Sequence, residues 1–112
     1  MSSQNTYHQI DARELNRVIS DADGYPVVVI FTTEWSGESI LLENVIDRIA
    51  DDFPDTRFYS IDIEDEEELA YNMGVSYAPT TMVNCDGEWV DVFSGVMNRR
   101  RLIERLQNNS CY

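Results

Sequence analysis

The segment Val27–Phe31, which reads VVVIF, limits most strongly what this chain can fold into. Consecutive apolar residues that are mostly β-branched are typical of a strand buried on both faces of a sheet. Such a strand needs helices on each side of the sheet, and helical patterns precede and follow it. The sequence therefore predicts an α/β fold with this strand inside the sheet.

Helical and extended patterns alternate along the rest of the chain. We expect helices over 11–22, 39–53 and 64–74 and from Asn98 onward, with Asp11 and Asn98 as N-caps. We expect further strands over 57–63, 80–84 and 88–95, the last two joined by a hairpin turn, and a candidate edge strand over 6–10. A βαβ unit followed by a hairpin and a helix predicts a mixed sheet with helices on both faces.

The length of 112 residues predicts one domain, with a short extension over 1–6 and a tail over 108–112. The longest apolar run is far shorter than the roughly 20 residues that span a bilayer. The first residues have neither a positive start nor an apolar segment, so we expect no signal peptide and a cytoplasmic location.

The net charge is −13, from 21 carboxylates against eight arginines and no lysine. A nucleic-acid-binding protein needs a basic face, and the main basic cluster is Arg99–Arg101 with Arg105. We therefore expect no nucleic-acid partner and no anionic membrane surface. The charge has two open explanations, which are solubility as a monomer and adaptation to a high-salt host.

The two cysteines, Cys85 and Cys111, are 26 positions apart and match no C-x-x-C or zinc-binding spacing. We expect two unrelated free thiols, with Cys111 on a frayed tail. The single histidine, His8, has no neighbours at metal-ligand spacing, so we expect no metal site and no cofactor.

The segment Thr32–Ser39, which reads TTEWSGES, follows the apolar strand and precedes a helical pattern. Further along come SIDIED, ELAYNMGVSYAPTT, the turn NCDGEWV and SGV. In this order and at these spacings the chain resembles the thioredoxin family over nearly its whole length. The resemblance implies a three-layer fold, with a mixed sheet of four to five strands and about four helices, and a cis peptide bond before Pro79.

The family motif W-C-G-x-C places two cysteines at the start of a helix, where Ser36 and Ser39 stand here. The helix dipole lowers the pKa of the first thiol, and the second thiol resolves the mixed disulfide. Serine oxygens cannot undergo this exchange. The family's usual buried Asp, its Lys partner and the proline in the motif helix fall at Ile30, Ser60 and Asn44.

Ser36 is an unpromising nucleophile of another kind, because His8 is distant and nothing orients Glu34 or Glu38 as a base. We expect the Ser36 hydroxyl to serve as the N-cap of the helix.

The resemblance also implies a groove that binds an extended peptide or protein segment by β-strand addition. Its expected residues are Trp35, Gly37, Glu38, Tyr77, Ala78, Pro79, Gly95 and Val96. The main interpretation is a redox-inactive thioredoxin-like protein that binds a peptide or protein. The alternatives are a thiol–disulfide oxidoreductase whose motif cysteines were replaced by serine and a purely structural subunit.

Overall fold

The computed structural model describes residues 7–109 and residue 111. The expected extension over 1–6 and the tail residues Ser110 and Tyr112 lie outside the described residues. Within the described part of the chain, no helix is long and apolar enough to cross a membrane.

A five-stranded mixed sheet forms the middle of the molecule, in the order β1-β3-β2-β4-β5. Its strands are β1 (His8–Gln9), β2 (Val27–Thr32), β3 (Arg57–Asp62), β4 (Thr80–Cys85) and β5 (Glu88–Ser94). β1 and β2 run parallel to β3, whereas β4 runs antiparallel to β2 and to β5. The strand expected to be buried, β2, lies at the centre.

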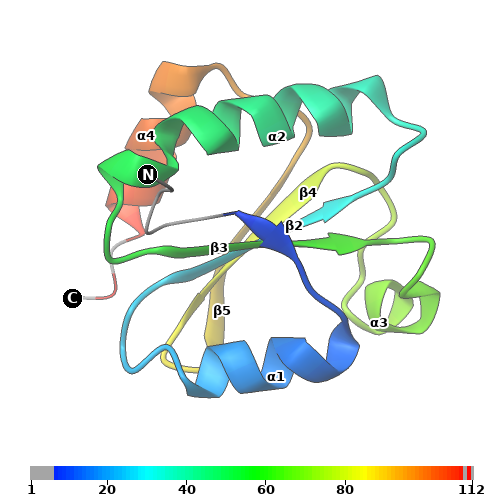
Figure 1. Cartoon of the computed structure of the whole chain (residues 1–112), viewed down its shortest axis with the longest axis horizontal. Helices are drawn as coiled ribbons and strands as arrows, with labels where there is room; N and C mark the ends of the chain where they lie inside the picture. Colours follow the sequence, from blue (N-terminus) through cyan, green and yellow to red (C-terminus); the bar gives the residue numbers. More distant parts are fainter. Residues whose placement is uncertain (1–6, 110, 112) are drawn as a thin grey trace.

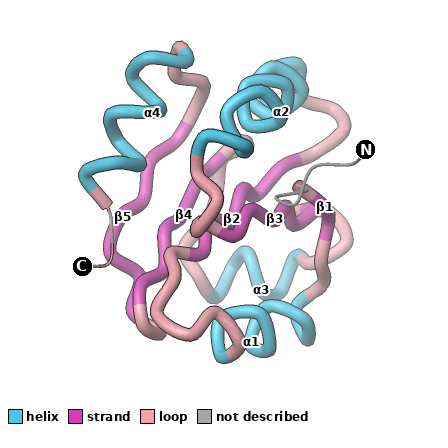
Figure 2. Tube along the Cα trace, turned by 60° about the vertical axis from the view of Figure 1, so that its left-hand side comes forward, coloured by secondary structure: helices cyan, strands magenta, loops and turns pink. Residues whose placement is uncertain are grey.

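Four α-helices cover the two faces of the sheet (Figure 1). They are α1 (Ala12–Ser20), α2 (Gly37–Ile49), α3 (Glu67–Asn72) and α4 (Arg99–Asn108), and a short 3₁₀ helix η1 (Ala50–Asp52) extends α2. Figure 2 shows α2 and α4 on one face of the sheet and α1 and α3 on the other. The expected three-layer α/β fold is confirmed.

The central strand is buried along its whole length because helices cover both of its faces. Val28 and Ile30 pack in the apolar cluster that contains residues of α2 and α4. Val27, Val29 and Phe31 pack in the second cluster, which contains Leu15 of α1. Successive side chains of a strand point to opposite faces, so a continuous apolar run supplies both clusters.

Local side-chain signals start the helices and close the hairpin. Asp11 and Glu14 form a capping box at the start of α1, and the Asn98 side chain accepts a hydrogen bond from the Arg101 N–H at 2.9 Å. In the turn between β4 and β5, Asp86 and Gly87 both have positive φ, of 54° and 86°. Two consecutive residues with positive φ give a turn whose twist matches that of the two strands, and the Asp-Gly pair favours such a turn.

The expectation of two free thiols is wrong. Cys85 at the end of β4 and Cys111 beyond α4 form a disulfide, with Cα atoms 5.5 Å apart. The two cysteines are 26 positions apart, and β5 and α4 lie between them in the sequence. These two elements pack back beside β4 and so bring the cysteines together. Cys111 is therefore covalently attached to the end of a strand, contrary to the expected frayed tail.

Candidate functional site

The segment WSGES forms the turn between β2 and α2. The Ser36 N–H donates to the Thr33 carbonyl at 3.2 Å, and Ser36 has extended backbone angles immediately before α2 begins at Gly37. Its hydroxyl oxygen accepts a hydrogen bond from the Ser39 N–H at 3.2 Å. Ser36 is the N-cap of α2, as the sequence predicts.

The Ser36 hydroxyl also donates its proton across the site, to the Ala78 carbonyl oxygen at 3.3 Å. The hydroxyl is thus used as donor and acceptor by backbone groups. Among the described residues, no carboxylate or imidazole forms a hydrogen bond with it, which a serine nucleophile would need. The geometry is that of a cap and a bridge between two loops.

Ser39, the second motif serine, is completely buried. Its hydroxyl oxygen accepts a hydrogen bond from the Thr33 N–H at 3.3 Å, which ties the first turn of α2 to the end of β2. A buried hydroxyl in such a bond stabilises the turn locally and has no route to solvent.

The loop Tyr77–Pro79 lies opposite the motif and carries a cis peptide bond between Ala78 and Pro79. The Thr80 hydroxyl donates to the Tyr77 carbonyl at 2.5 Å, and the Gly95 N–H donates to the Pro79 carbonyl at 2.8 Å. Gly95 has a φ of 83°, which favours glycine at this position. The structure therefore brings together the three segments that the sequence assigned to one groove.

Carboxylates lie beside the motif turn and the Tyr77–Pro79 loop. The Tyr77 hydroxyl donates a hydrogen bond to Glu38, and this bond together with the negative charge of Glu38 raises the pKa of Tyr77. The Thr33 hydroxyl donates to Glu64 at 3.1 Å, and Glu34 is exposed beside them. These carboxylates place negative charge beside the two loops, and negative charge opposes acidic ligands.

Large apolar side chains are exposed around the motif. Trp35 is 78% exposed, Tyr77 48% and Val96 37%. Two others that the sequence did not assign to the site are Ile40 and Leu41 in the first turns of α2, and both are more than half exposed. Leu41 lies one helical turn beyond Gly37 and extends the same side of α2. The sequence carried a signal, because Ile40, Leu41 and the buried Leu42 are consecutive apolar residues, and three in a row span more of the helix circumference than one buried stripe covers.

Beneath the motif, Ile30 occupies the position where the resemblance places a carboxylate. It pairs with Ser60 of β3 on one side and with Thr81 of β4 on the other, and all three are buried. The Thr81 hydroxyl oxygen has no hydrogen-bond partner among the described residues. Directly paired residues point to the same face of a sheet, so Ile30 stands between two hydroxyl side chains.

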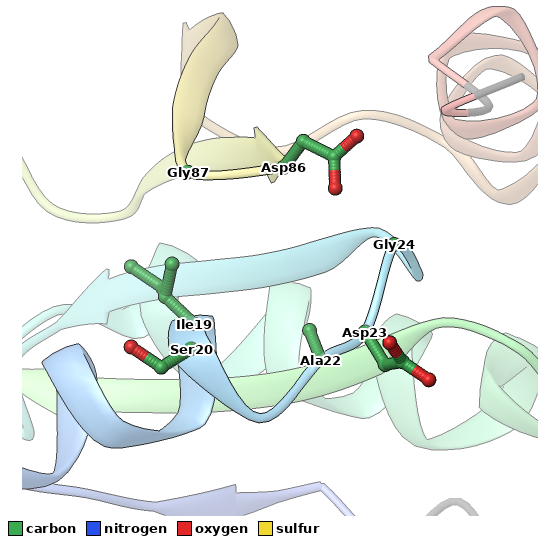
Figure 3. A pocket seen from close by; sticks show the side chains of 7 residues that line it. All are labelled: Ile19, Ser20, Ala22, Asp23, Gly24, Asp86 and Gly87. Carbon is green, nitrogen blue, oxygen red and sulfur yellow. The ribbon is translucent and has the colours of Figure 1, made fainter.

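At the opposite edge of the sheet, a hollow of about 440 Å³ lies between the β4–β5 turn and the loop after α1 (Figure 3). Asp86 and Asp23 come from these two loops. Among the described residues, no group of three or more His, Cys, Asp or Glu side chains is placed to hold a metal ion. The hollow contains none of the residues that the sequence assigned to a site.

Comparisons with known proteins identify the family of the chain. The family model described as Thioredoxin matches residues 6–108. The chain is 28% identical to thioredoxin from Ophiophagus hannah over 97 residues, which cover 87% of this chain and 91% of the relative. It is 30% identical over 95 residues to thioredoxin Asp f 29 from Aspergillus fumigatus, covering 83% of this chain and 86% of that protein.

Solved structures show the same similarity. A mutant thioredoxin from Halobacterium salinarum superposes with a TM-score of 0.86 at 25% identity, over 98% of this chain and 96% of that chain. Fasciola hepatica thioredoxin superposes with a TM-score of 0.85 at 28% identity, over 94% and 100%. The chain therefore belongs to the thioredoxin family.

Proposed function

We propose that this protein is a thioredoxin-like protein whose WSGES motif is redox-inactive and which binds an extended segment of a partner protein in a groove beside Pro79. The observation that carries the proposal is the pair of serines at the start of α2. The Ser36 hydroxyl is used by the Ser39 N–H and the Ala78 carbonyl, and Ser39 is buried. A helix start that would activate a thiol here holds oxygen atoms that cannot exchange with a disulfide.

Exposed apolar side chains support binding at this edge. Trp35, Leu41 and Tyr77 lie in the motif turn, in α2 and in the opposite loop, and each is largely exposed. Large exposed apolar side chains gathered at one place mark interaction sites in soluble proteins. The Ala78 carbonyl keeps a second lone pair beside the one used by Ser36, so it can still accept an N–H from an added strand.

The acidic rim supports a partner segment that combines apolar residues with lysine or arginine. Glu34, Glu38 and Glu64 surround the groove, and the whole chain carries a net charge of −13. Complementary charge increases the association rate and discriminates against acidic segments. The same charge supports a monomer that binds neither nucleic acid nor anionic membranes.

Catalytic silence is tested with insulin and dithiothreitol. The protein should not accelerate insulin reduction above the rate with dithiothreitol alone, because the motif has no thiol. The variant Cys85→Ser/Cys111→Ser serves as the control for the remaining cysteines. Turnover by this double variant would overturn the redox-inactive assignment.

Binding is tested with a library of defined peptides that vary charge around an apolar centre. Backbone hydrogen bonds contribute about 1 kcal/mol each, so isolated basic peptides should bind with dissociation constants of about 10 μM or weaker. Trp35→Ala should weaken binding strongly, whereas Val90→Ala, which truncates an exposed apolar side chain near the β4–β5 turn, should leave it unchanged. Equal binding by both variants would place the binding surface elsewhere.

The alternative function, an oxidoreductase whose motif cysteines were replaced by serine, is favoured by one observation. The whole chain superposes on a structure described as a mutant thioredoxin with a TM-score of 0.86. Codons for cysteine at positions 36 and 39 of the encoding gene would establish this alternative, and serine codons would exclude it.

A further inference from the structure

The Cys85–Cys111 disulfide lies at the edge of the sheet opposite the motif. β4 runs antiparallel to β2, so Asn84 near the end of β4 pairs with Val27 at the start of β2. The motif follows the other end of β2, beyond Thr32. A strand of this length spans about 20 Å, so the disulfide is too far from Ser36 to take part in any reaction there.

Both cysteines of this disulfide are partly exposed to solvent. The Asp86-Gly87 turn that follows Cys85 is exposed. The turn borders the hollow seen in Figure 3. Thiol–disulfide exchange requires that a thiolate approach one of the two sulfur atoms, and partial exposure satisfies this requirement.

A second, non-covalent attachment holds the same two elements together. Asp91 of β5 accepts two hydrogen bonds from the Arg105 guanidinium of α4, at 2.6 and 2.7 Å. The Asn109 side-chain amide donates to Asp91 at 2.6 Å and to the Arg105 carbonyl at 3.0 Å. These contacts between Asp91, Arg105 and Asn109, which we call the α4 clamp, end two positions before Cys111.

The α4 clamp does not involve the sulfur atoms, so breaking the disulfide does not remove these hydrogen bonds between α4 and β5. Once the S–S bond is broken, Asn109 still holds the end of α4 on β5, so the Cys111 thiol stays close to the Cys85 thiol. A pair of thiols held close together has a high effective concentration and forms an intramolecular disulfide readily.

We propose that Cys85 and Cys111 form a reversible thiol–disulfide site, which small dithiols reduce and glutathione disulfide oxidises while the protein stays folded. In reduction, a dithiol thiolate attacks one sulfur atom, a mixed disulfide forms, and the other cysteine leaves as a thiolate that takes a proton from water. The second thiol of the reductant then releases the first cysteine and closes its own disulfide. The protein gains two electrons and two protons, and the reductant loses them.

The test treats the folded protein with dithiothreitol, blocks thiols with N-ethylmaleimide and counts adducts by mass spectrometry. We expect two adducts, at Cys85 and Cys111, with unchanged far-ultraviolet circular dichroism. A second reduced sample is freed of dithiothreitol and treated with glutathione disulfide before blocking. It should then carry no N-ethylmaleimide adduct and have the mass of the original disulfide-bonded protein. Adducts that appear only in denaturant, loss of helix on reduction, or a final product carrying bound glutathione would each overturn the proposal.

A second measurement tests the role of the α4 clamp. The measured quantity is the oxidation midpoint in a glutathione buffer. It is defined as the ratio [GSH]²/[GSSG] at which half of the protein is oxidised. Asn109→Ala should lower this ratio about threefold to tenfold, since it removes hydrogen bonds that keep the thiols close. Asn108→Ala, at the exposed neighbouring position, is the control and should match the unmodified protein. Equal ratios for all three proteins would overturn the preorganised pair on which the proposal rests.

Discussion

The loops at the two ends of the strands are held together by different means. We call the end beside WSGES the motif edge and the end beside the disulfide the opposite edge. At the motif edge, hydroxyl groups make hydrogen bonds of 3.2 and 3.3 Å between Ser36, Ser39 and Ala78, beside an exposed Trp35. At the opposite edge, a covalent bond joins β4 to the segment after α4, and Asp91 accepts a bidentate contact at 2.6 and 2.7 Å. The first edge is open and polar, whereas the second is tightly bonded.

This difference separates partner binding from stability. Exposed apolar side chains contribute little to the folded state, because folding buries little of their surface. A charged pair that is partly buried and fully hydrogen-bonded is costly to break, since its remaining member stays without a partner. We therefore expect truncation of the exposed apolar side chains at the motif edge to change partner binding, and loss of the Asp91–Arg105 pair at the opposite edge to change stability.

The largest expected effect is a gain of activity at the motif edge. In the Cys85→Ser/Cys111→Ser background, Ser36→Cys with Ser39→Cys should turn insulin reduction from undetectable to measurable, because the start of α2 would stabilise a thiolate. Ser36→Cys without Ser39→Cys is the control and should not turn over. Failure of the double substitution in a folded protein would show that the motif edge has lost the geometry of its family.

Adding Ile30→Asp to the Ser36→Cys/Ser39→Cys variant tests whether a buried carboxyl at this position assists the restored reaction. The new carboxyl would stand between the buried hydroxyls of Ser60 and Thr81, which can hydrogen-bond it. A buried carboxyl that moves a proton to and from the second thiol should speed insulin reduction about tenfold or more. Ile30→Asn, of similar size but unable to titrate, is the matched control. Equal rates for the two variants would mean that proton transfer does not limit the restored enzyme.

At the opposite edge, Asp91→Asn should lower the free energy of unfolding by about 1–2 kcal/mol, since Arg105 loses its charged partner. The Arg105 hydrogen bonds hold the pKa of Asp91 below its usual value, so this stability is present above the ordinary Asp pKa of about 3.9 and is lost as pH falls through the lower folded value.

Denaturant unfolding of both proteins between pH 2 and 7 checks this dependence. The difference in unfolding free energy should be constant near neutral pH and shrink as Asp91 takes up a proton. Glu88→Gln, an exposed substitution on the same strand, is the control and should differ little from the unmodified protein at any pH. A difference that is the same at pH 2 and 7 would contradict the assigned role of the Asp91 charge.

A smaller effect is expected for Ser36→Ala, which removes the N-cap of α2 and the bond to Ala78. The unfolding free energy should fall by about 1 kcal/mol. Peptide binding should persist, since the substitution leaves the Ala78 carbonyl free to accept a hydrogen bond from the ligand. Ser20→Ala, at an exposed position, is the control for stability. Lost binding in a folded Ser36→Ala protein would give the hydroxyl a direct role that the proposed function does not include.

The smallest expected effect is that of salt on the whole chain. Raising NaCl from 0.01 to 0.3 M shortens the Debye length from about 30 Å to below 10 Å, so the thermal midpoint should rise by a few degrees as repulsion among the carboxylates is screened. A plateau above this concentration would indicate ordinary charge repulsion, and a continued rise toward molar salt would favour a high-salt host. No rise at all would show that the carboxylates are already compensated.

The sequence by itself determined the framework, because its signals are local. The β-branched run predicted β2, the capping side chains Asp11 and Asn98 predicted where α1 and α4 begin, and Asp86-Gly87 predicted the hairpin. The resemblance to the thioredoxin family placed the groove residues, and the structure brings Ser36 to Ala78 and Gly95 to Pro79. Each of these depends on neighbouring residues or on a motif of fixed spacing.

The tertiary structure alone decided which distant side chains meet. Cys85 and Cys111 pair only because β5 and α4 fold back between them, and no spacing rule connects two cysteines 26 positions apart. The contacts of Asp91 with Arg105 and of Glu38 with Tyr77 likewise join separate elements. Propensity and periodicity act over a few residues, whereas these contacts are set by the packing of whole helices on the sheet.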